Sequence, residues 1–259
     1  MKKILSCFLV CAFLCTGLYG CGSKKTELIE EAKDLTLSQE ISITPEQNDY
    51  GIPAYNFLKH IQSNYPGRVA GTEKETEMAV FILSVLLNGG YAESDIAMMD
   101  EAIQNVFDGG EKSNSSQNIL ITKQGESEKA IIVGAHYDSA GTHGVDDNGS
   151  GVSVALENAL RMVNTPTYYT IQYVFFGSEE PGMYGSRAYV ESLSEKEREN
   201  IILMINIDTV LAGDYLYLYG GKVNDNGTVD NTEAVFKAYE IVKEIGLNIQ
   251  LPPDGNNDY

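Results

Sequence analysis

The sequence predicts an α/β fold, a three-layer sandwich in which a central, mostly parallel β-sheet is flanked by helices. Apolar runs such as residues 130–134 and 170–176 do not alternate with polar residues, which is typical of strands buried on both faces. Stretches with the apolar spacing of amphipathic helices lie between or after these runs. Glycine and acidic residues follow the ends of several runs, where ligands bind in such sheets. Strands that alternate with helices build a largely parallel sheet covered on both sides.

Residues 1–20 have the order of a signal peptide. They begin with a methionine and two lysines, continue as an apolar run to Leu18, and end just before Cys21. The run is too short to span a bilayer comfortably. Leu18-x-Gly20-Cys21 resembles the bacterial lipobox, which implies cleavage before Cys21 and attachment of a diacylglycerol to it. We therefore expect an exported, lipid-anchored protein on the outward face of the cell membrane, extracellular or periplasmic; the alternative is an ordinary cleavage site near Cys21.

The composition argues against nucleic acid as a partner. The chain has 37 acidic and 18 basic residues and a formal net charge of −19, which repels phosphate backbones. A well-solvated exported surface explains most of this acidity, but converging carboxylates also favour metal cations. The three other cysteines lie within residues 1–20, so the mature chain keeps none for a disulfide or a thiolate-bound metal.

The N-terminal part of the mature chain predicts a tether followed by two helices. Residues 21–48 are polar, with few large apolar side chains, as expected of a flexible tether, and residues 49–259 suit one domain. Apolar residues at helical spacing over 55–61 predict a short helix. Thr72 and Glu75 form a capping box for a second helix, which a run of asparagine and glycines ends near residue 90.

The rest of the domain predicts strands alternating with helices. The strands are expected at residues 118–122, 130–134, 170–176, 201–207 and 215–219. The helices are expected at residues 152–163 and 233–245, with a shorter one from residue 186 to about 193.

The first strand end whose side chains could bind a metal or take part in catalysis carries His136 and Asp138. In extended backbone, residues two apart face the same way, so His136 can point into a site while Asp138 orients its ring. Alone, this pattern is also typical of a hydrogen bond at a strand end. The turn that carries Asp146 and Asp147 follows, with Asp147 eleven residues beyond His136. One of the two aspartates can cap the N-terminus of the next helix, but such a cap does not explain the presence of the other.

Two further strand ends carry carboxylates. Glu179 and Glu180 follow the strand at 170–176, and Asp208 follows the strand at 201–207. Adjacent carboxylates point in different directions, so one can bind a metal while its neighbour faces the water. One histidine and several carboxylates suit zinc or a harder ion such as manganese. A carboxylate shared by two ions about 3.5–4 Å apart would make a site that hydrolyses amides.

These four segments, in this order, resemble the di-zinc aminopeptidases of bacterial secretions, which are related to glutamate carboxypeptidases and glutaminyl cyclases. The resemblance covers the chain from about residue 50 and includes residues 65–72. It implies a zinc exopeptidase-like fold of the phosphorylase/hydrolase type for residues 49–259. The matching segments are His136-x-Asp138, Asp146-Asp147-Asn148-x-Ser150-Gly151, Glu179-Glu180-x-Gly182-x-x-Gly185-Ser186 and Asn206-x-Asp208.

The resemblance implies a zinc-dependent exopeptidase, most simply an aminopeptidase that removes N-terminal residues from peptides outside the cytoplasmic membrane. It implies two zinc ions per complete site, with His136 and Asp208 on one ion, Asp147 bridging, and Glu180 on the other. Glu179 would be the general base for a metal-bridging water. Asp138 would orient the ring of His136 from behind.

The family has one more zinc ligand, a histidine in a Ser-Asp-His segment near the end of its domain. The chain's histidines are His60, His136 and His143, and none follows Asp208. We therefore expect a C-terminally truncated domain that lacks the last strand and helix, with a weakened second zinc site. His143 could in principle approach the metal, although the family does not use that position, and His60 is expected in surface or core packing.

Other interpretations remain open at this point. Residues 146–151 with Glu157 match the ligand spacing of an EF-hand calcium loop, but a strand precedes them and Ser153 takes the usual apolar position. A lipoprotein that binds peptides or metal without catalysis is the second alternative. A second di-zinc exopeptidase family has a much longer stretch between its histidine and bridging aspartate. A carboxypeptidase would need cations for a terminal carboxylate, and Arg187 is the one basic residue in the motif segments.

Overall fold

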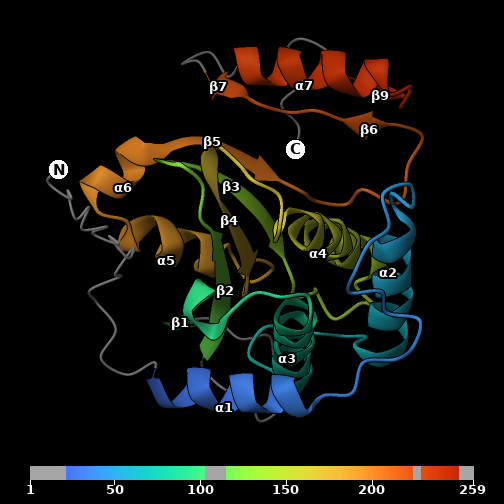
Figure 1. The fold of residues 1–259 in the computed structure, drawn as a ribbon, viewed down its shortest axis with the longest axis vertical. Helices are drawn as coiled ribbons and strands as arrows, with labels where there is room; N and C mark the ends of the chain where they lie inside the picture. Colours follow the sequence, from blue (N-terminus) through green and yellow to red (C-terminus); the bar gives the residue numbers. More distant parts are fainter. Residues whose placement is uncertain (1–21, 103–114, 224–228, 251–259) are drawn as a thin grey trace, which may run out of the picture.

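A computed structural model describes residues 22–102, 115–223 and 229–250, and a five-stranded sheet forms its centre (Figure 1). The order across the sheet is β1-β2-β4-β3-β5, and β4, β3 and β5 run parallel while β1 and β2 pair antiparallel. The α/β prediction is confirmed, with a mixed sheet. The three-residue link between β2 and β3 reverses the chain, so β2 must oppose the parallel set. The strands are β1 (Ile96–Ala102), β2 (Ser115–Lys123), β3 (Ser127–His136), β4 (Tyr169–Phe176) and β5 (Ile201–Asn206).

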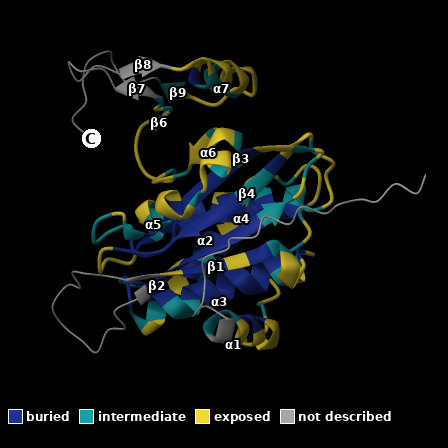
Figure 2. Ribbon diagram, turned by 90° about the vertical axis from the view of Figure 1, so that its left-hand side faces the viewer, coloured by how far each residue is buried: buried dark blue, intermediate teal, exposed yellow. Residues whose placement is uncertain are grey.

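Helices cover both faces of the sheet. On one face, Ile121, Val133 and Phe175 pack with the helices α2, α3 and α4; on the other, Leu120 and Ile132 pack with Tyr189 of α5. Figure 2 shows the buried residues running through the middle layer, and β3 and β4 are buried on both faces as predicted, whereas the edge strand β5 is largely exposed. The helices are α1 (Gly22–Asp34), α2 (Ile52–Asn64), α3 (Glu73–Asn88), α4 (Gly151–Met162), α5 (Tyr184–Ser192) and α6 (Glu195–Asn200), with short turns η1 (Glu93–Asp95) and η2 (Val145–Ser150).

The segment at residues 22–34 differs from the expected flexible tether. It forms α1, which packs against α3 and buries Leu28, Ile29 and Ala32 in the core. These three residues form a narrow apolar stripe on one face of the helix, while charged side chains occupy the remaining faces. The sequence predicted a tether because the composition of the segment as a whole is polar, and three apolar residues do not change that composition. Strand β1 was also not predicted, because acidic and small residues interrupt its apolar positions.

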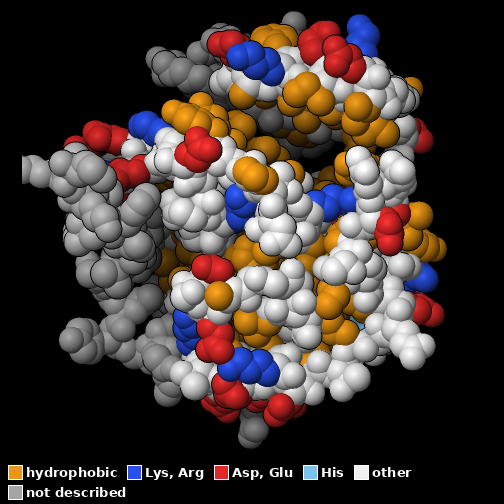
Figure 3. All heavy atoms as spheres, in the orientation of Figure 1, with side chains coloured by type: hydrophobic (Ala, Val, Ile, Leu, Met, Phe, Trp, Pro, Cys, Tyr) orange, Lys and Arg blue, Asp and Glu red, His pale blue; other side chains and the backbone are white. Residues whose placement is uncertain are grey.

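The residues after β5 form a small C-terminal module above the edge of the main sheet (Figure 1). The strand expected at 215–219 is shorter and pairs outside the main sheet. Hydrophobic side chains gather around the hollow between this module and the main sheet (Figure 3). The module contains β6 (Leu216–Tyr217), β7 (Gly221–Val223), β8 (Val229–Asn231), α7 (Glu233–Glu244) and β9 (Ile249–Gln250). None of the helices that the structure describes is both long enough and apolar enough to cross a membrane.

Candidate metal centre

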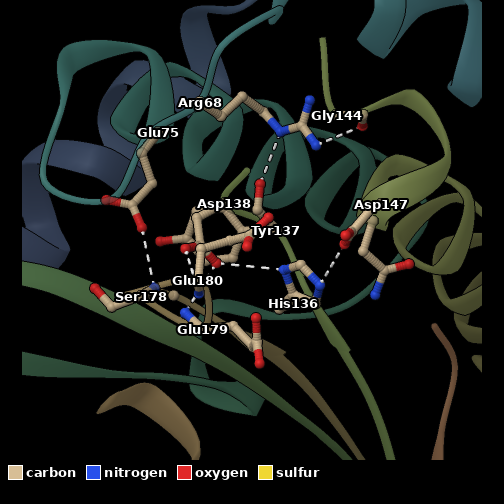
Figure 4. A network of polar contacts seen from close by, with 12 residues as sticks. Arg68, Glu75, His136, Tyr137, Asp138, Gly144, Asp147, Ser178, Glu179 and Glu180 are labelled. Carbon is tan, nitrogen blue, oxygen red and sulfur yellow. Dashed lines mark hydrogen bonds and ion pairs between the residues drawn. The ribbon is translucent and has the colours of Figure 1, made fainter. Parts of the chain in front are cut away.

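Three predicted ligands meet at the carboxyl edge of the sheet. His136 is the last residue of β3 and is buried, Asp147 lies in the turn η2, and Asp208 lies two residues beyond β5. His136 Nε2 is 3.0 Å from Asp147 Oδ1 and 3.7 Å from Asp208 Oδ2. Figure 4 shows His136 and Asp147 pointing toward each other. One ligand atom from each of the three residues lies within 4.8 Å of the others, so together they can hold a metal ion.

The donor set fits zinc. One imidazole nitrogen and two carboxylates are ligands that zinc accepts, and the second ring nitrogen of His136 lies 3.4 Å from Asp138 Oδ1. A carboxylate behind a histidine orients the ring and raises its basicity as a ligand. Burial lowers the pKa of His136, but interactions with Asp138 and Asp208 outweigh burial and raise it to about 10. The carboxylates thus favour positive charge at this ring.

Asp138 has a second role that the sequence did not predict. Its fully buried carboxylate accepts hydrogen bonds from the backbone N–H of Glu179 at 3.0 Å and of Glu180 at 3.2 Å. The same carboxylate faces His136, so one side chain connects the end of β3 with the segment after β4. The relative position of the metal ligands and the glutamate pair therefore depends on Asp138.

Glu179 and Glu180 are half-buried beside this group but are not part of the three-residue cluster. Burial raises the pKa of Glu179; the charge of His136 lowers it, and the carboxylates of Asp138 and Asp208 raise it. Burial also raises the pKa of Glu180, and the charge of Asp147 adds to the increase. Both glutamates thus lie close enough to the metal-binding group for its charges to shift their pKa values.

The segment that carries the two glutamates is held by side chains from three other elements. We call residues 177–180 the Glu-Glu turn. Its four consecutive N–H groups donate in order to Asn118 Oδ1 (3.1 Å), Glu75 Oε1 (3.3 Å) and the two carboxylate oxygens of Asp138. Asn118 lies on β2, and Glu75 lies in the first turn of α3. Thr72 caps α3 as predicted, but the predicted capping box is only half formed, because the Glu75 carboxyl accepts from the N–H of Gly71 and not from that of Thr72, and it reaches toward this turn.

Arg68 is a buried residue whose function the sequence did not reveal. Its guanidinium donates to the carbonyls of Tyr65 (3.0 Å), Tyr137 (2.8 Å), His143 (3.3 Å) and Gly144 (2.8 Å). Figure 4 shows Arg68 above the site, bonded to Tyr137 and Gly144. Gly144 has a φ of 59°, and a Cβ there would lie 2.7 Å from Arg68 Nη2, so glycine is required. Arg68 therefore fixes the loop between His136 and Asp147.

Electrostatics offset part of the cost of burying this cation. Burial lowers the pKa of Arg68 to about 10, whereas the charges of Asp138, Asp147 and Glu180 raise it. Within the described residues, no carboxylate forms a salt bridge with Arg68. The guanidinium thus neutralises the carboxylate cluster at a distance while its N–H groups bind carbonyls.

The acidic turn before α4 binds the segment that carries Asp208. Asp146 accepts hydrogen bonds from the backbone N–H of Leu211 at 2.8 Å and of Ala212 at 3.2 Å. The Asn148 side chain donates to the carbonyl of Ile207 at 2.9 Å. The peptide bond between Asp147 and Asn148 is cis. These contacts explain why the turn needs more polar residues than one helix cap.

The calcium-loop interpretation is wrong. Glu157, which would be its last ligand, instead accepts from the N–H groups of Gly51 and Ala54 at the start of α2, at 3.1 Å and 2.9 Å. Arg161 Nη2 lies 2.7 Å from the same carboxylate. His143 is exposed and lies outside the metal-binding group, and His60 stacks on Phe81.

Two relatives show similar sequences over different lengths. The alkaline phosphatase isozyme conversion protein of Escherichia coli (strain K12) is 29% identical over 241 residues, or 83% of this chain and 66% of that protein. The probable lipoprotein aminopeptidase LpqL of Mycobacterium tuberculosis (strain ATCC 25618 / H37Rv) is 40% identical over 100 residues, or 38% of this chain and 20% of that protein. The matched regions thus span just under two thirds of the first relative and a fifth of the second.

Solved structures and a family profile agree with these relatives. BSAP, a zinc aminopeptidase from Bacillus subtilis, has the same fold, with a TM-score of 0.62, 19% identity, and coverage of 76% of this chain and 78% of that chain. Glutaminyl cyclases share the fold as well. Residues 118–253, just over half of the sequence, match the profile of Peptidase family M28. The resemblance seen in the sequence is confirmed, and the chain belongs to peptidase family M28, whose homologues are zinc aminopeptidases and glutaminyl cyclases.

Proposed function

We propose that this chain is a zinc-dependent aminopeptidase that hydrolyses N-terminal residues from peptides. The observation that supports this most is the convergence of His136, Asp147 and Asp208 beside the Glu-Glu turn, with Asp138 connecting the two. A mixed set of one imidazole and several carboxylates matches hydrolytic zinc sites with open positions. The M28 relative whose name includes aminopeptidase supports the same reaction class.

Each side chain then has a proposed role. His136 and Asp208 would hold one zinc ion, Glu180 would hold a second, and Asp147 would serve both. Zinc supplies Lewis acidity toward the scissile carbonyl and lowers the pKa of water nearby. Glu179 takes the proton of the attacking water and returns it to the leaving amine, for which its half-buried position and raised pKa are suitable.

The charges around the site favour a substrate with a free amino group. Several carboxylates converge here, and they attract an ammonium group and repel a terminal carboxylate. Arg68 is not available to a substrate carboxylate, because its side chain is fully buried and four of its five N–H groups donate to carbonyls. Arg187 is exposed on α5. An aminopeptidase therefore fits better than a carboxypeptidase.

The zinc-loaded chain is tested on three substrates. Leucine p-nitroanilide has a free amino group, N-acetyl-leucine p-nitroanilide has a blocked one, and an N-acetylated peptide with a free C-terminus tests for carboxypeptidase activity. We expect turnover of the free-amine substrate alone. Asp208→Asn should lose this turnover and about 100-fold or more of the zinc affinity, because replacing a direct ligand lowers metal affinity at least as much as replacing a residue that only hydrogen-bonds to a ligand. Asp214→Asn, at an exposed aspartate, is the matched control. Zinc affinity is measured by calorimetry.

Other results would redirect the proposal. Cyclisation of an N-terminal glutaminyl peptide without hydrolysis of leucine p-nitroanilide would assign the chain to the glutaminyl cyclase type. Zinc and peptide binding with no turnover of any substrate would favour a non-catalytic binding lipoprotein. Equal zinc affinity in Asp208→Asn and Asp214→Asn would show that Asp208 is not a ligand.

We also propose that the chain is exported and anchored through Cys21. The predicted signal peptide and lipobox at residues 1–21 lie outside the described residues, and the name of the Mycobacterium relative supports a lipoprotein. We expect radiolabelled palmitate to be incorporated into the wild-type chain expressed in a bacterium, but not into Cys21→Ser. Equal labelling of both proteins would contradict the anchor at this residue.

A further inference from the structure

The Glu-Glu turn has a backbone shape that needs support from outside. Ser178, directly before Glu179, has a φ of 49°, a left-handed conformation that residues other than glycine rarely adopt. Ser178 is also fully buried. Its N–H bonds to Glu75, a residue about a hundred positions earlier in the chain (Figure 4). The path of the backbone into Glu179 and Glu180 therefore depends on a contact between distant segments.

We propose that Glu75 is a positioning residue that holds the catalytic Glu179 and the neighbouring Glu180 in place through the N–H group of Ser178. This inference rests on the proposed peptidase function, because it assigns Glu75 a part in presenting the general base. Within the described residues, Glu75 makes no hydrogen bond or ion pair with His136, Asp147 or Asp208.

The contacts of the Glu75 carboxyl connect three segments. Oε2 accepts from the N–H of Gly71 at 2.6 Å, and Oε1 meets the hydroxyl of Ser116 at 2.5 Å and the N–H of Ser178 at 3.3 Å. Gly71 belongs to the segment before α3, Ser116 to β2, and Ser178 to the Glu-Glu turn. A simple helix cap would need only the first contact. The other two point the carboxyl toward the site.

The support that Glu75 gives does not depend on its ionisation. Burial raises the pKa of Glu75 to about 8, and the donors from Ser116, Gly71 and Ser178 lower it. When the carboxyl is ionised, it accepts from all three donors. When it is protonated, it can donate to the Ser116 hydroxyl, which accepts as readily as it donates, and still accept from Ser178.

A second buried glutamate provides a matched control. Glu157 accepts backbone N–H groups at the start of α2 as Glu75 does at the start of α3, and both are nearly inaccessible to solvent. Glu157 makes no hydrogen bond to the Glu-Glu turn within the described residues. Glu75→Gln and Glu157→Gln therefore remove similar local contacts, but only the first reaches the turn.

The experiment compares these two variants in the full chain by hydrogen exchange and by kinetics. Glutamine brings an N–H₂ group in place of one acceptor, so Glu75→Gln cannot satisfy all three donors. We expect faster amide exchange across residues 177–180 in Glu75→Gln only. We also expect its kcat to fall by roughly 10- to 100-fold with KM and zinc content near wild type, because misplacing a catalytic group costs rate more than binding. Glu157→Gln should keep wild-type kcat.

The outcomes separate this inference from the proposed function. If wild type hydrolyses peptides and Glu75→Gln matches Glu157→Gln in both exchange and kcat, Glu75 is only a helix cap and the inference is wrong. If wild type has no peptidase activity, the proposed function fails, and the exchange of residues 177–180 alone decides the inference. If Glu75→Gln does not fold, Glu75→Asp replaces it, because aspartate keeps the carboxylate near Gly71 but is too short for Ser178.

Discussion

Replacing Glu179 with glutamine is expected to lower kcat by about 100- to 10,000-fold, the range that general-base catalysis contributes. The amide has nearly the same shape as the carboxylate but cannot accept a proton from water. Glu179 lies outside the group of three residues that can hold a metal, so zinc content should stay at the wild-type value. The measurement is steady-state kinetics on leucine p-nitroanilide together with zinc analysis, and exposed Glu191→Gln is the matched control.

A paired variant tests the assignment of roles within the Glu-Glu turn. Glu180→Gln is expected to lose zinc from one of two positions, because Glu180 is proposed to bind metal. If Glu180→Gln keeps its zinc and loses kcat while Glu179→Gln loses zinc, the two roles are exchanged. If neither variant changes kcat, the general base lies elsewhere.

Replacing Arg68 with methionine is expected to lower the free energy of unfolding by roughly 3 kcal/mol or more. Methionine fills much of the volume, but it removes one donor from each of four carbonyls, of which that of Gly144 keeps a second donor, the N–H of Gly149 at 3.1 Å. Each buried polar group left unsatisfied costs about 1–3 kcal/mol. The loop between His136 and Asp147 then loses its anchor. The free energy of unfolding of Arg68→Lys should lie between those of wild type and Arg68→Met, because an ammonium cannot reproduce the geometry of the guanidinium.

Denaturant unfolding monitored by circular dichroism measures this loss, with exposed Arg187→Met as the control. Zinc affinity should fall in parallel in Arg68→Met, since His136 and Asp147 flank the affected loop. A stability equal to that of Arg187→Met would mean that water or a shift of the loop satisfies the four carbonyls, and that Arg68 does not organise the site.

The metal-binding group could be predicted from the sequence because its geometry follows from the sheet. His136 ends β3 and Asp208 follows β5, and because these are neighbouring parallel strands, their carboxyl ends lie at the same edge of the sheet. Asp147 lies in the turn that leads into α4 beside them. For His136 and Asp208, the local pattern of an apolar strand that ends in polar residues carries the information, and for Asp147 the acidic turn before a helix does.

Arg68 and Glu75 could not be predicted in the same way. Local sequence gives Glu75 the role of a capping-box residue, and it gives Arg68 no role at all. Their functions come from contacts with Tyr137, Gly144 and Ser178, which lie 69 to 103 positions away in the chain. Only the packing of α2 and α3 on the sheet brings these groups together. The helix α1 could not be predicted for a related reason, because its narrow apolar stripe is buried only through packing against α3.

The hydrogen bonds of Arg68 and Glu75 also bear on where the smallest working unit of this chain begins. The family profile matches from residue 118 onward, and every proposed metal ligand lies within that match. Two of the groups that hold these segments lie upstream of it: Arg68, which holds the loop after β3, and Glu75, which supports the turn after β4 together with Asn118 and Asp138. A fragment cut at the profile boundary would contain all of the ligands without the framework that aims them. The segment before α3 and the first turn of α3 thus belong to the proposed catalytic apparatus, as do the strands that bear its side chains.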